Sequence, residues 1–520
     1  MFEKYFNNKF LILYFIPFIL GSLSILAFNP FNITILNLLI FPTFFYLTIY
    51  INKKSRSTYR KKPYKKNLFI FGLFFGLGFY LTGVSWISNS LTFDESFKIL
   101  IPFSLILIPL FLSLFIAIPI VIVGPYLTLN FTSIFIFSSS LAFSDYVRAK
   151  VLTGFPWNLW AYSTTSLNEI IQIVNVIGLY SYNLILITLF TLPIIFFFKI
   201  SNFKKIITFI SICLTIISLY IYGNYEINKN KKTLNQTDQR ILIKVVSPNF
   251  ELEYGLNQKE IENRFKKIIR YSEPNKDKKT IFVWPEGIFS GYSFKEILIF
   301  KELITNNFSN KHHIIFGVNR LDPKTGNFYN SMLLVNSNFE IIQSYNKRKL
   351  VPFGEFLPFE NLLNRFGIKK ITEGYGSFLK GSENKNLLLN NLKILPLICY
   401  EVIFTNLIQK SEIDTNLVIN ISEDGWFGNT IGPDQHFSKS IFRAIENGTF
   451  FVRSANKGVS AIIDNRGNII KQLNRNEAGN LEFEVPLIKS NKIKNDLIFF
   501  VLLITYLLVF LFYREKNAKK

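Results

Sequence analysis

At residues 395–401 the chain reads Leu-Pro-Leu-Ile-Cys-Tyr-Glu, an apolar β-type run that ends on a thiol. The chain has two cysteines, and Cys399 is the one that lies outside a membrane-length apolar run. A thiol at a strand end, followed closely by the carboxylate of Glu401, suits a nucleophile at the mouth of a pocket. A single buried cysteine is more often a small core residue, so the interpretation depends on the rest of the chain.

The composition indicates an integral membrane protein. The chain has 520 residues, 57 of them Phe, and a mean hydropathy of +0.27. About 20 helical residues, rising 1.5 Å each, cross the hydrocarbon layer of a bilayer. We predict about eight spans: Phe10–Phe28, Ile33–Ile51, Leu68–Ser88, Ile99–Val123, Phe131–Phe143, Tyr182–Phe198, Ile206–Tyr222 and Leu497–Tyr513.

The net charge of +23 lies largely in short loops between these apolar runs, where basic residues set membrane topology. The largest cluster, Lys53–Lys66, contains no acidic residue and is interpreted as a cytoplasmic anchor. We therefore predict no nucleic-acid partner. With the N-terminus inside, eight crossings place the region from about Gly223 to Asp496 outside the cytoplasm.

That middle region has a different character, because short β-type runs alternate with helical patterns at its start. This alternation predicts a layered α/β domain with a partly antiparallel or mixed sheet. The expected strands are Ile241–Val246, Thr280–Trp284, His313–Val318, Ser331–Val335, Ile341–Tyr345, Ile394–Ile398, Asn416–Ile421, Phe450–Ser454 and Val459–Asp464.

Two short stretches of the apolar region indicate how its helices pack and where they meet the membrane surface. Gly72, Gly76 and Gly78 lie on or near one helix face, where small residues allow close helix contact in lipid. The aromatic stretch Gly154–Trp160 suits the membrane–water interface. An aromatic belt and a role in handling lipid are both open for it.

Three polar residues follow strands of the middle region. Glu286, Lys347 and Cys399 come after the runs Thr280–Trp284, Ile341–Tyr345 and Ile394–Ile398. A carboxylate can take the thiol proton, and an ammonium can stabilise a thiolate and the oxyanion formed when the thiolate attacks a carbonyl. No histidine is required. The three histidines have no partners at metal-ligand spacing, so we predict no metal site and expect His436 to be a structural hydrogen-bonding residue.

These residues resemble the Glu-Lys-Cys triad of the nitrilase superfamily, and the whole arrangement resembles bacterial apolipoprotein N-acyltransferases. The supporting motifs run nearly end to end: Gly76–Phe79, Gly83–Ile87, Gly154–Asn158, Trp284–Gly287, Lys347–Glu355, Cys399–Glu401, Asp424–Gly428, Gly432–His436 and Arg453–Gly458.

The resemblance implies a membrane α-helical bundle with an extracytoplasmic αββα sandwich. The expected parts are residues 1–223 as a seven-span bundle, 224–495 as the catalytic domain, and 496–520 as a last helix with a basic cytoplasmic tail. The protein would be a multi-pass protein of the bacterial inner membrane, with its catalytic domain on the periplasmic side. A monomer without cofactors is expected.

The resemblance also implies a reaction in two steps. Cys399 would take an acyl chain from a phospholipid as a thioester and pass it to the N-terminal α-amine of an S-diacylglyceryl-cysteine apolipoprotein. Glu286 would be the base and Lys347 the electrostatic partner. The supporting or substrate-binding residues would be Glu355, Tyr400, Glu401 and Trp426.

The sequence departs from the family pattern at two places. Glu423 stands where Asn is expected, and Glu253-Tyr254-Gly255 replaces an expected Lys-Trp pair.

The stretch Gly367–Asn384 is a candidate lid. Two other functions stay open: a membrane-tethered nitrilase-type amidase, and a non-catalytic receptor or transporter. Without the resemblance, Lys347 in its basic run would be interpreted as solvated.

Overall fold

The computed structural model describes residues 8–58, 63–358, 360, 376–382, 385–412, 414–492 and 495–518. Most of the candidate lid lies outside these residues, as does part of the basic cluster Lys53–Lys66. The chain forms two compact units, one of residues 1–225 and 495–520 and the other of residues 226–494.

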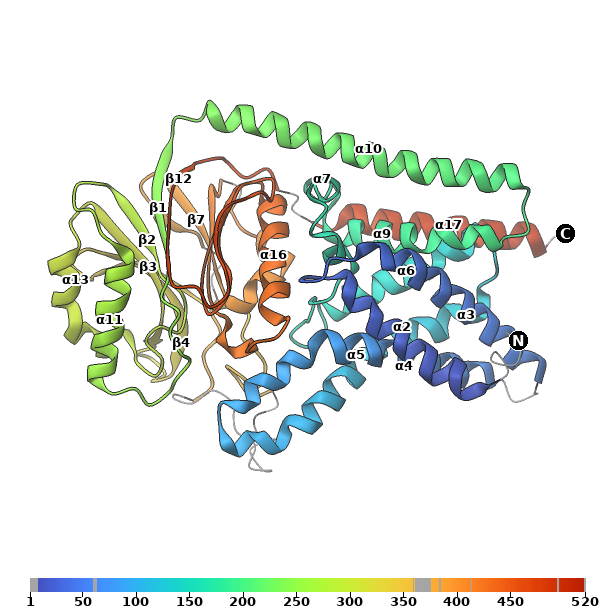
Figure 1. The fold of residues 1–520 in the computed structure, drawn as a ribbon, viewed down its shortest axis with the longest axis horizontal. Helices are drawn as coiled ribbons and strands as arrows, with labels where there is room; N and C mark the ends of the chain where they lie inside the picture. The colour runs from blue at the N-terminus through green and yellow to red at the C-terminus, as the bar shows by residue number, and fades with distance from the viewer. Residues whose placement is uncertain are drawn as a thin grey trace. The chain divides into compact units, whose positions relative to one another are not determined.

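The first unit is helical, as predicted (Figure 1). Six described helical segments are long and apolar enough to cross a membrane: Thr34–Arg56, Pro63–Thr92, Glu95–Tyr126, Leu179–Phe197, Asn202–Asn235 and Leu497–Lys516. Of the other two predicted spans, Phe10–Phe28 forms the shorter apolar run Leu11–Ala27, and Phe131–Phe143 lies in α6 (Phe131–Arg148). The count of eight crossings stays a prediction.

The helices of this unit are α2 (Ile16–Ser24), α3 (Asn37–Thr58), α4 (Pro63–Val84), α5 (Ile101–Val123), α6, α7 (Asn168–Ile171), α8 (Val174–Ile177), α9 (Leu179–Thr191), α10 (Asn202–Asn235) and α17 (Leu497–Ala518).

The predicted close contact through glycines is confirmed. A Cβ on Gly76 would lie 2.7 Å from Ser113 Cα of α5, and one on Gly78 would lie 2.0 Å from the Phe18 carbonyl oxygen of α2. Only glycine lets α4 approach both helices.

The aromatic stretch Gly154–Trp160 is packed inside the bundle. Trp157 is fully buried, with the ring of Trp86 4.4 Å away and that of Phe155 6.0 Å away. Trp160 stacks on Phe79 at 4.7 Å. Neither indole is exposed as a ring of an interfacial belt would be, so these side chains hold the bundle together.

The second unit contains two six-stranded sheets. The first has the order β12-β1-β2-β3-β4-β5 and the second β11-β10-β9-β8-β7-β6. Each combines parallel and antiparallel pairs, which confirms the predicted mixed character. The strands are β1 (Arg240–Ser247), β2 (Thr280–Val283), β3 (His312–Leu321), β4 (Phe328–Asn336), β5 (Ile341–Asn346), β6 (Leu387–Leu389), β7 (Leu392–Ile398), β8 (Leu417–Glu423), β9 (Phe450–Asn456), β10 (Ser460–Ile463), β11 (Ile469–Leu473) and β12 (Gly479–Pro486).

Helices cover the outer face of each sheet, which gives the expected αββα layers (Figure 1). On the first sheet lie α11 (Gln258–Ser272), α12 (Phe294–Ile297) and α13 (Lys301–Asn307). On the second lies α16 (Gly432–Asn447), and α15 (Thr405–Gln409) packs against α16. The first outer core is aromatic, because Phe265 stacks on Phe289 at 4.2 Å and Phe316 on Phe339 at 5.8 Å. Burial of such side chains stabilises the fold by roughly 1.5–3 kcal/mol each.

Candidate active site

The three candidate triad residues all follow strands. Glu286 comes after β2 and Lys347 directly after β5, both in the first sheet, whereas Cys399 directly follows β7 in the second. The two sheets approach closely here because Gly317 on β3 lacks a side chain. A Cβ on Gly317 would lie 2.9 Å from Glu286 Cα and 3.0 Å from Ile421 Cδ1 of the opposite sheet. The sheets therefore meet at Glu286, and the charges of Glu286 and Lys347 act on the Cys399 thiol, so the three strand ends lie near one another.

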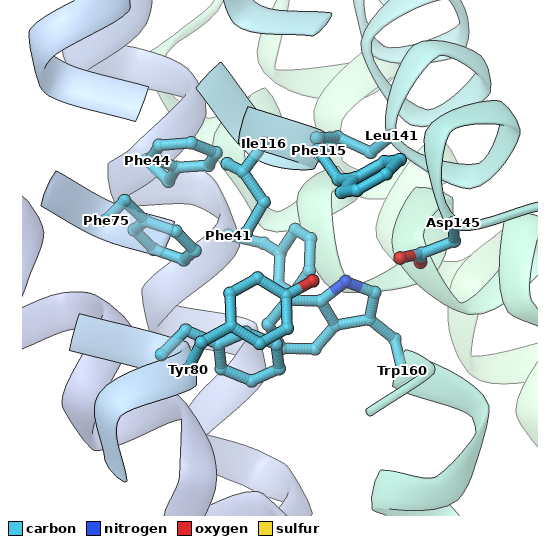
Figure 2. A pocket seen from close by; sticks show the side chains of 10 residues that line it. Phe41, Phe44, Phe75, Tyr80, Phe115, Ile116, Leu141, Asp145 and Trp160 are labelled. Carbon is cyan, nitrogen blue, oxygen red and sulfur yellow. The ribbon is translucent and has the colours of Figure 1, made fainter. Parts of the chain in front are cut away.

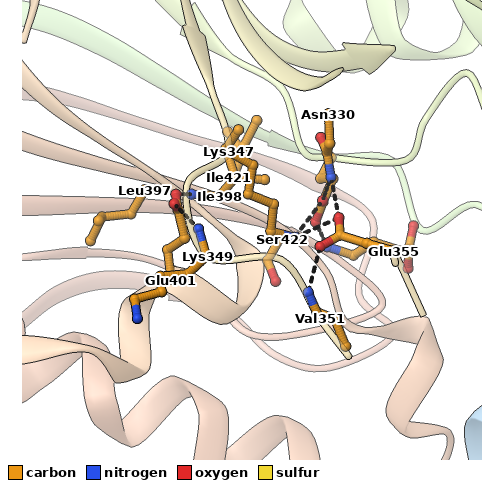
Figure 3. A network of polar contacts seen from close by, with 12 residues as sticks. Asn330, Lys347, Lys349, Val351, Glu355, Leu397, Ile398, Glu401, Ile421 and Ser422 are labelled. Carbon is orange, nitrogen blue, oxygen red and sulfur yellow. Dashed lines mark hydrogen bonds and ion pairs between the residues drawn. The ribbon is translucent and has the colours of Figure 1, made fainter. Parts of the chain in front are cut away.

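The Lys347 ammonium is buried between two carboxylates (Figure 3). Its Nζ donates to Glu355 Oε1 at 2.9 Å and to Glu286 Oε1 at 3.4 Å, and the residue is only 1% exposed. Burial alone would lower the pKa of Lys347, but Glu286 and then Glu355 outweigh it and raise the pKa above its ordinary value. The group stays an ammonium, so the interpretation of Lys347 as a solvated residue is wrong.

Asn330 on β4 completes this cluster, and the sequence analysis missed it. Its Nδ2 donates to Glu286 Oε1 and to Glu355 Oε1, each at 2.7 Å, and its backbone oxygen accepts from the Lys347 backbone N–H at 2.9 Å. Figure 3 shows Asn330 above Glu355 and beside Lys347. Asn330 thus fixes both carboxylates through its side-chain amide and the Lys347 backbone through its own carbonyl. An Asn beside a run of buried strand residues is the signal that could have found it.

The Cys399 thiol is the buried nucleophile candidate. The backbone of Cys399 has a φ of +48°, a left-handed conformation that costs a residue with a Cβ roughly 1–2 kcal/mol. Burial raises the pKa of the thiol above its ordinary value; the Glu286 charge raises it further, and Lys347 opposes both. The resting sulfur therefore carries its proton, and attack on a carbonyl requires a base.

Glu355 is fixed as firmly as the triad candidates. Besides the bonds to Asn330 and Lys347, its Oε2 accepts from the Val351 backbone N–H at 2.8 Å. Since its Oε1 is the nearer of the two oxygens bonded to the Lys347 ammonium, Glu355 holds that ammonium in place.

Glu401 joins the lysine segment to the cysteine segment. Its Oε1 accepts from the backbone N–H groups of Arg348 at 2.7 Å and Lys349 at 3.1 Å, and its Oε2 accepts from the Ile398 N–H at 2.9 Å. The Tyr345 hydroxyl also donates to this carboxylate. Glu401 is fully buried. Glu401 therefore bonds to the backbone on both sides of the site, before Cys399 and after Lys347.

Tyr400 and Trp426 are placed differently. Tyr400 is buried beside the nucleophile, with its ring edge to face with Phe404 at 5.1 Å. Trp426 lies in the short 3-10 turn Asp424–Phe427, is half-buried, and has the Tyr254 ring 6.0 Å away. Tyr254 is one of the residues that replace the expected Lys-Trp pair, so an aromatic contact is present there despite the departure.

His436 is a structural residue, as predicted. Its Nδ1 lies 2.9 Å from Asp424 Oδ1, and both residues are buried. Burial lowers the pKa of His436 to about 4, with Asp424 opposing, so the ring is neutral near pH 7. Arg453 donates to Asp424 Oδ2 at 2.7 Å. Burial would raise the pKa of Asp424, but Arg453 and His436 hold it well below its usual range.

A small pocket lies within the helical unit. Figure 2 shows its lining, in which Tyr80, Asp145 and Trp160 are the polar members among Phe and aliphatic side chains. Its volume is about 10 Å³, which is room for about one water molecule. It is too small for a lipid chain, so it does not compete with the cluster around Cys399 as a reaction site.

Glu401→Gln is expected to destabilise the second unit. The amide nitrogen would face backbone N–H donors that now point at carboxylate oxygens, and each buried unmatched donor costs about 1–3 kcal/mol. Thermal unfolding of the purified protein measures the effect. Glu484→Gln, an exposed carboxylate on β12, is the matched control and is expected to leave Tm unchanged. Equal Tm values for both variants would contradict the supporting role of Glu401.

Comparison with known proteins gives matches in both units. Residues 20–192 match the family model described as the apolipoprotein N-acyltransferase N-terminal domain, and residues 254–493 match that of the carbon-nitrogen hydrolases. The apolipoprotein N-acyltransferase of Rickettsia prowazekii is 31% identical, over 95% of this chain and 98% of that protein. That of Rhodopseudomonas palustris is 29% identical, over 91% of this chain and 89% of that protein.

Among solved structures, Saccharomyces cerevisiae Nit3, a member of branch 10 of the nitrilase superfamily, is 18% identical. The match covers 48% of this chain and 91% of that one, with a TM-score of 0.35. The family models match both units and the relatives match nearly the whole chain, so the chain belongs to the apolipoprotein N-acyltransferase family.

Proposed function

We propose that this protein transfers an acyl chain from a phospholipid to the N-terminal α-amine of S-diacylglyceryl-cysteine apolipoproteins, with Glu286, Lys347 and Cys399 as catalytic triad. The observation that carries the proposal is the buried ammonium held beside a protonated thiol and two carboxylates, in a chain that also has membrane-length helices. That cluster supplies a nucleophile, a base and an oxyanion partner.

The first step forms the thioester. Glu286 takes the proton of the Cys399 thiol while the sulfur bonds to the carbonyl carbon of a phospholipid ester. The Lys347 ammonium stabilises the oxyanion. As the ester C–O bond breaks, Glu286 returns the proton to the departing alcohol oxygen, which leaves as a lysophospholipid. Glu355 and Asn330 hold the side chains of Lys347 and Glu286 in place through this step.

The second step forms the amide. The α-amine of the acceptor bonds to the thioester carbon, Lys347 again stabilises the oxyanion, and the C–S bond breaks. Glu286 moves a proton from the amine nitrogen to the departing sulfur, which restores the thiol. A thioester keeps the acyl group activated while one lipid replaces the other, so the two substrates need not be bound together.

The membrane-length helices favour this reaction over hydrolysis of a small amide. Donor and acceptor are both lipid-anchored, so an enzyme for them needs a bilayer, whereas an amidase for a soluble substrate does not. In this proposal residues 1–223 and 496–520 anchor the enzyme in the bacterial inner membrane, and residues 224–495 carry the reaction on its periplasmic side.

Mass spectrometry of a lipoprotein N-terminus tests the function. Cells with this protein as their only such enzyme are expected to yield N-acylated lipoprotein, and cells without it the free α-amine. A free amine in both would contradict the proposal. Release of ammonia from small amides by the purified protein, without N-acylation, would instead favour the membrane-tethered amidase.

The proposed orientation makes a separate prediction. Reporter fusions that are active only outside the cytoplasm are expected to work within residues 224–495 and to fail in the Lys53–Lys66 cluster, because basic segments that connect spans are retained inside. A cytoplasmic reporter should give the reverse pattern. Activity of the external reporter in the basic loop would overturn the orientation and remove access to exported lipoproteins.

A further inference from the structure

Glu423, the last residue of β8, is attached to the proposed base by its backbone and held rigidly by its side chain. Its N–H donates to Glu286 Oε2 at 3.1 Å. Its own Oε1 accepts from the Gly425 N–H and its Oε2 from Asn456 Nδ2, both at 2.8 Å. The residue is 2% exposed. A carboxyl group is thus built into the site where the family pattern has an amide.

The Glu423 carboxyl also packs against the backbone that follows the base. Gly287 has a φ of +74°, and a Cβ there would lie 2.9 Å from Glu423 Oε2. Glycine therefore serves two purposes at this position: it permits the left-handed turn after Glu286 and leaves room for the carboxyl. Any movement of charge on Glu286 occurs close to Glu423.

The charges around Glu423 are unbalanced. Lys347 forms ion pairs with Glu286 and Glu355, and Arg453 with Asp424. The bonds to the Glu423 oxygens come from uncharged donors. Its charged neighbours are Glu286, Asp424 and, from α11, Arg264, whose guanidinium donates to the carbonyls of Ile288 and Glu251. Burial raises the pKa of Glu423 to about 8, the bonds from Asn456 and Gly425 oppose this, and Glu286 and Asp424 add to it.

We propose that Glu423 is a positioning residue that tunes Glu286: when ionised, its charge favours transfer of the Cys399 proton to Glu286 and speeds formation of the thiolate. The inference rests on the proposed roles of Glu286 and Cys399. In this transfer one proton moves from sulfur to Glu286, so negative charge leaves the neighbourhood of Glu423. The charges with the largest effects on the thiol are those of Glu286, Lys347 and Asp424. An ionised Glu423 therefore repels the charge of Glu286 more strongly than it repels the charge of the thiolate.

The sign of the pH dependence follows. Below about pH 8 Glu423 is neutral and gives no assistance; above it the ionised group repels the charge of Glu286 and promotes proton transfer. The fraction of thiolate rises steadily with pH in every variant, and on top of this shared rise the reactivity of Cys399 is expected to show an additional step between about pH 7 and about pH 9. A step of about tenfold corresponds to one pK unit of interaction between the two carboxyls.

Alkylation of Cys399 by iodoacetamide tests this without any lipid. Rates are measured across the pH range by peptide mass spectrometry, on full-length protein in a Cys213→Ala background. The unsubstituted site is expected to show the step, Glu423→Gln to lose it, and Glu423→Asp to keep a smaller one. Glu251→Gln, an exposed carboxylate paired with Lys457, is the matched control and keeps the full step.

A step that persists in Glu423→Gln, or is absent from the unsubstituted site and from Glu423→Asp, would overturn the inference. A Glu423→Gln rate lowered equally at every pH with the step intact would mean a merely structural role, and would overturn it too. A protein that shows the expected alkylation profile but does not acylate lipoprotein would contradict the proposed function and leave the role of Glu423 supported.

Discussion

Cys399→Ala is expected to abolish acyl transfer while the protein still inserts and folds. The substitution removes one sulfur atom from a buried position, which leaves only a small void, but it removes the atom to which the acyl chain would be bonded. Activity is measured as N-acylation of a diacylglyceryl peptide by purified protein. Folding is checked by the Tm of the same preparation.

Cys213→Ala is the matched control. Cys213 lies in the membrane-length helix α10, outside the active-site unit, and its replacement is expected to leave the rate unchanged. Acyl transfer by folded Cys399→Ala at near the unsubstituted rate would mean that no thioester forms on this residue.

Lys347→Arg is expected to lower thioester formation by a factor on the order of 10² or more, the loss seen when an oxyanion donor is removed. The ammonium occupies a fully enclosed position between Glu286 and Glu355. Arginine keeps the charge, but its planar fork is bulkier and cannot reproduce the compact geometry. The measurement is a single turnover with phospholipid alone, which isolates the first step from acceptor binding.

The neighbours of Lys347 supply the controls. Arg348 and Lys349 are each half-buried, and the bonds that they make to Glu401 come from their backbone N–H groups. Arg348→Lys and Lys349→Arg keep those bonds and are expected to cost little. Equal rates for all three variants would show that Lys347 acts only as part of a charged surface.

The sequence was most informative where periodicity and strand-end residues coincide. The expected strands before Glu286, Lys347 and Cys399 are present. Those before Glu286 and Cys399 are apolar runs buried on both faces, which is typical of strands inside a layered α/β domain, whereas β5 before Lys347 begins with exposed residues. Strand β12 was not predicted, although Leu481, Phe483 and Val485 alternate along it. Its pairing with β1 joins segments about 240 residues apart, and no local pattern specifies such a pairing.

The site was predicted less completely than the fold. The basic run around Lys347 favours a solvated lysine, and its contacts with Glu286, Asn330 and Glu355 explain its burial. Glu286 and Asn330 come from distant segments of the chain. Glu401 could be placed beside the nucleophile, but its bonds to the Arg348 and Lys349 backbone depend on how two loops meet. Long-range polar contacts of this kind follow from tertiary packing, which sequence spacing does not contain.

The membrane region shows the same limit. The run Leu11–Ala27 is shorter than a full span because the helix ends before the Asn29-Pro30 turn. In the opposite direction, α10 continues beyond the predicted span Ile206–Tyr222 to Asn235, although Gly223 and the asparagines that follow it are poor helix formers. Apolar length alone predicts that a helix exists, but not where it ends.

The most direct test of the central proposal is detection of the acyl-enzyme itself. Purified protein is incubated with a phospholipid of one defined acyl chain, without acceptor, and the intact mass and the Cys399 peptide are measured. We expect one acyl group, sensitive to hydroxylamine, on Cys399, and its disappearance with formation of the amide when a diacylglyceryl peptide is added. Formation of the amide without any adduct on Cys399, or an adduct that only water removes, would contradict the account.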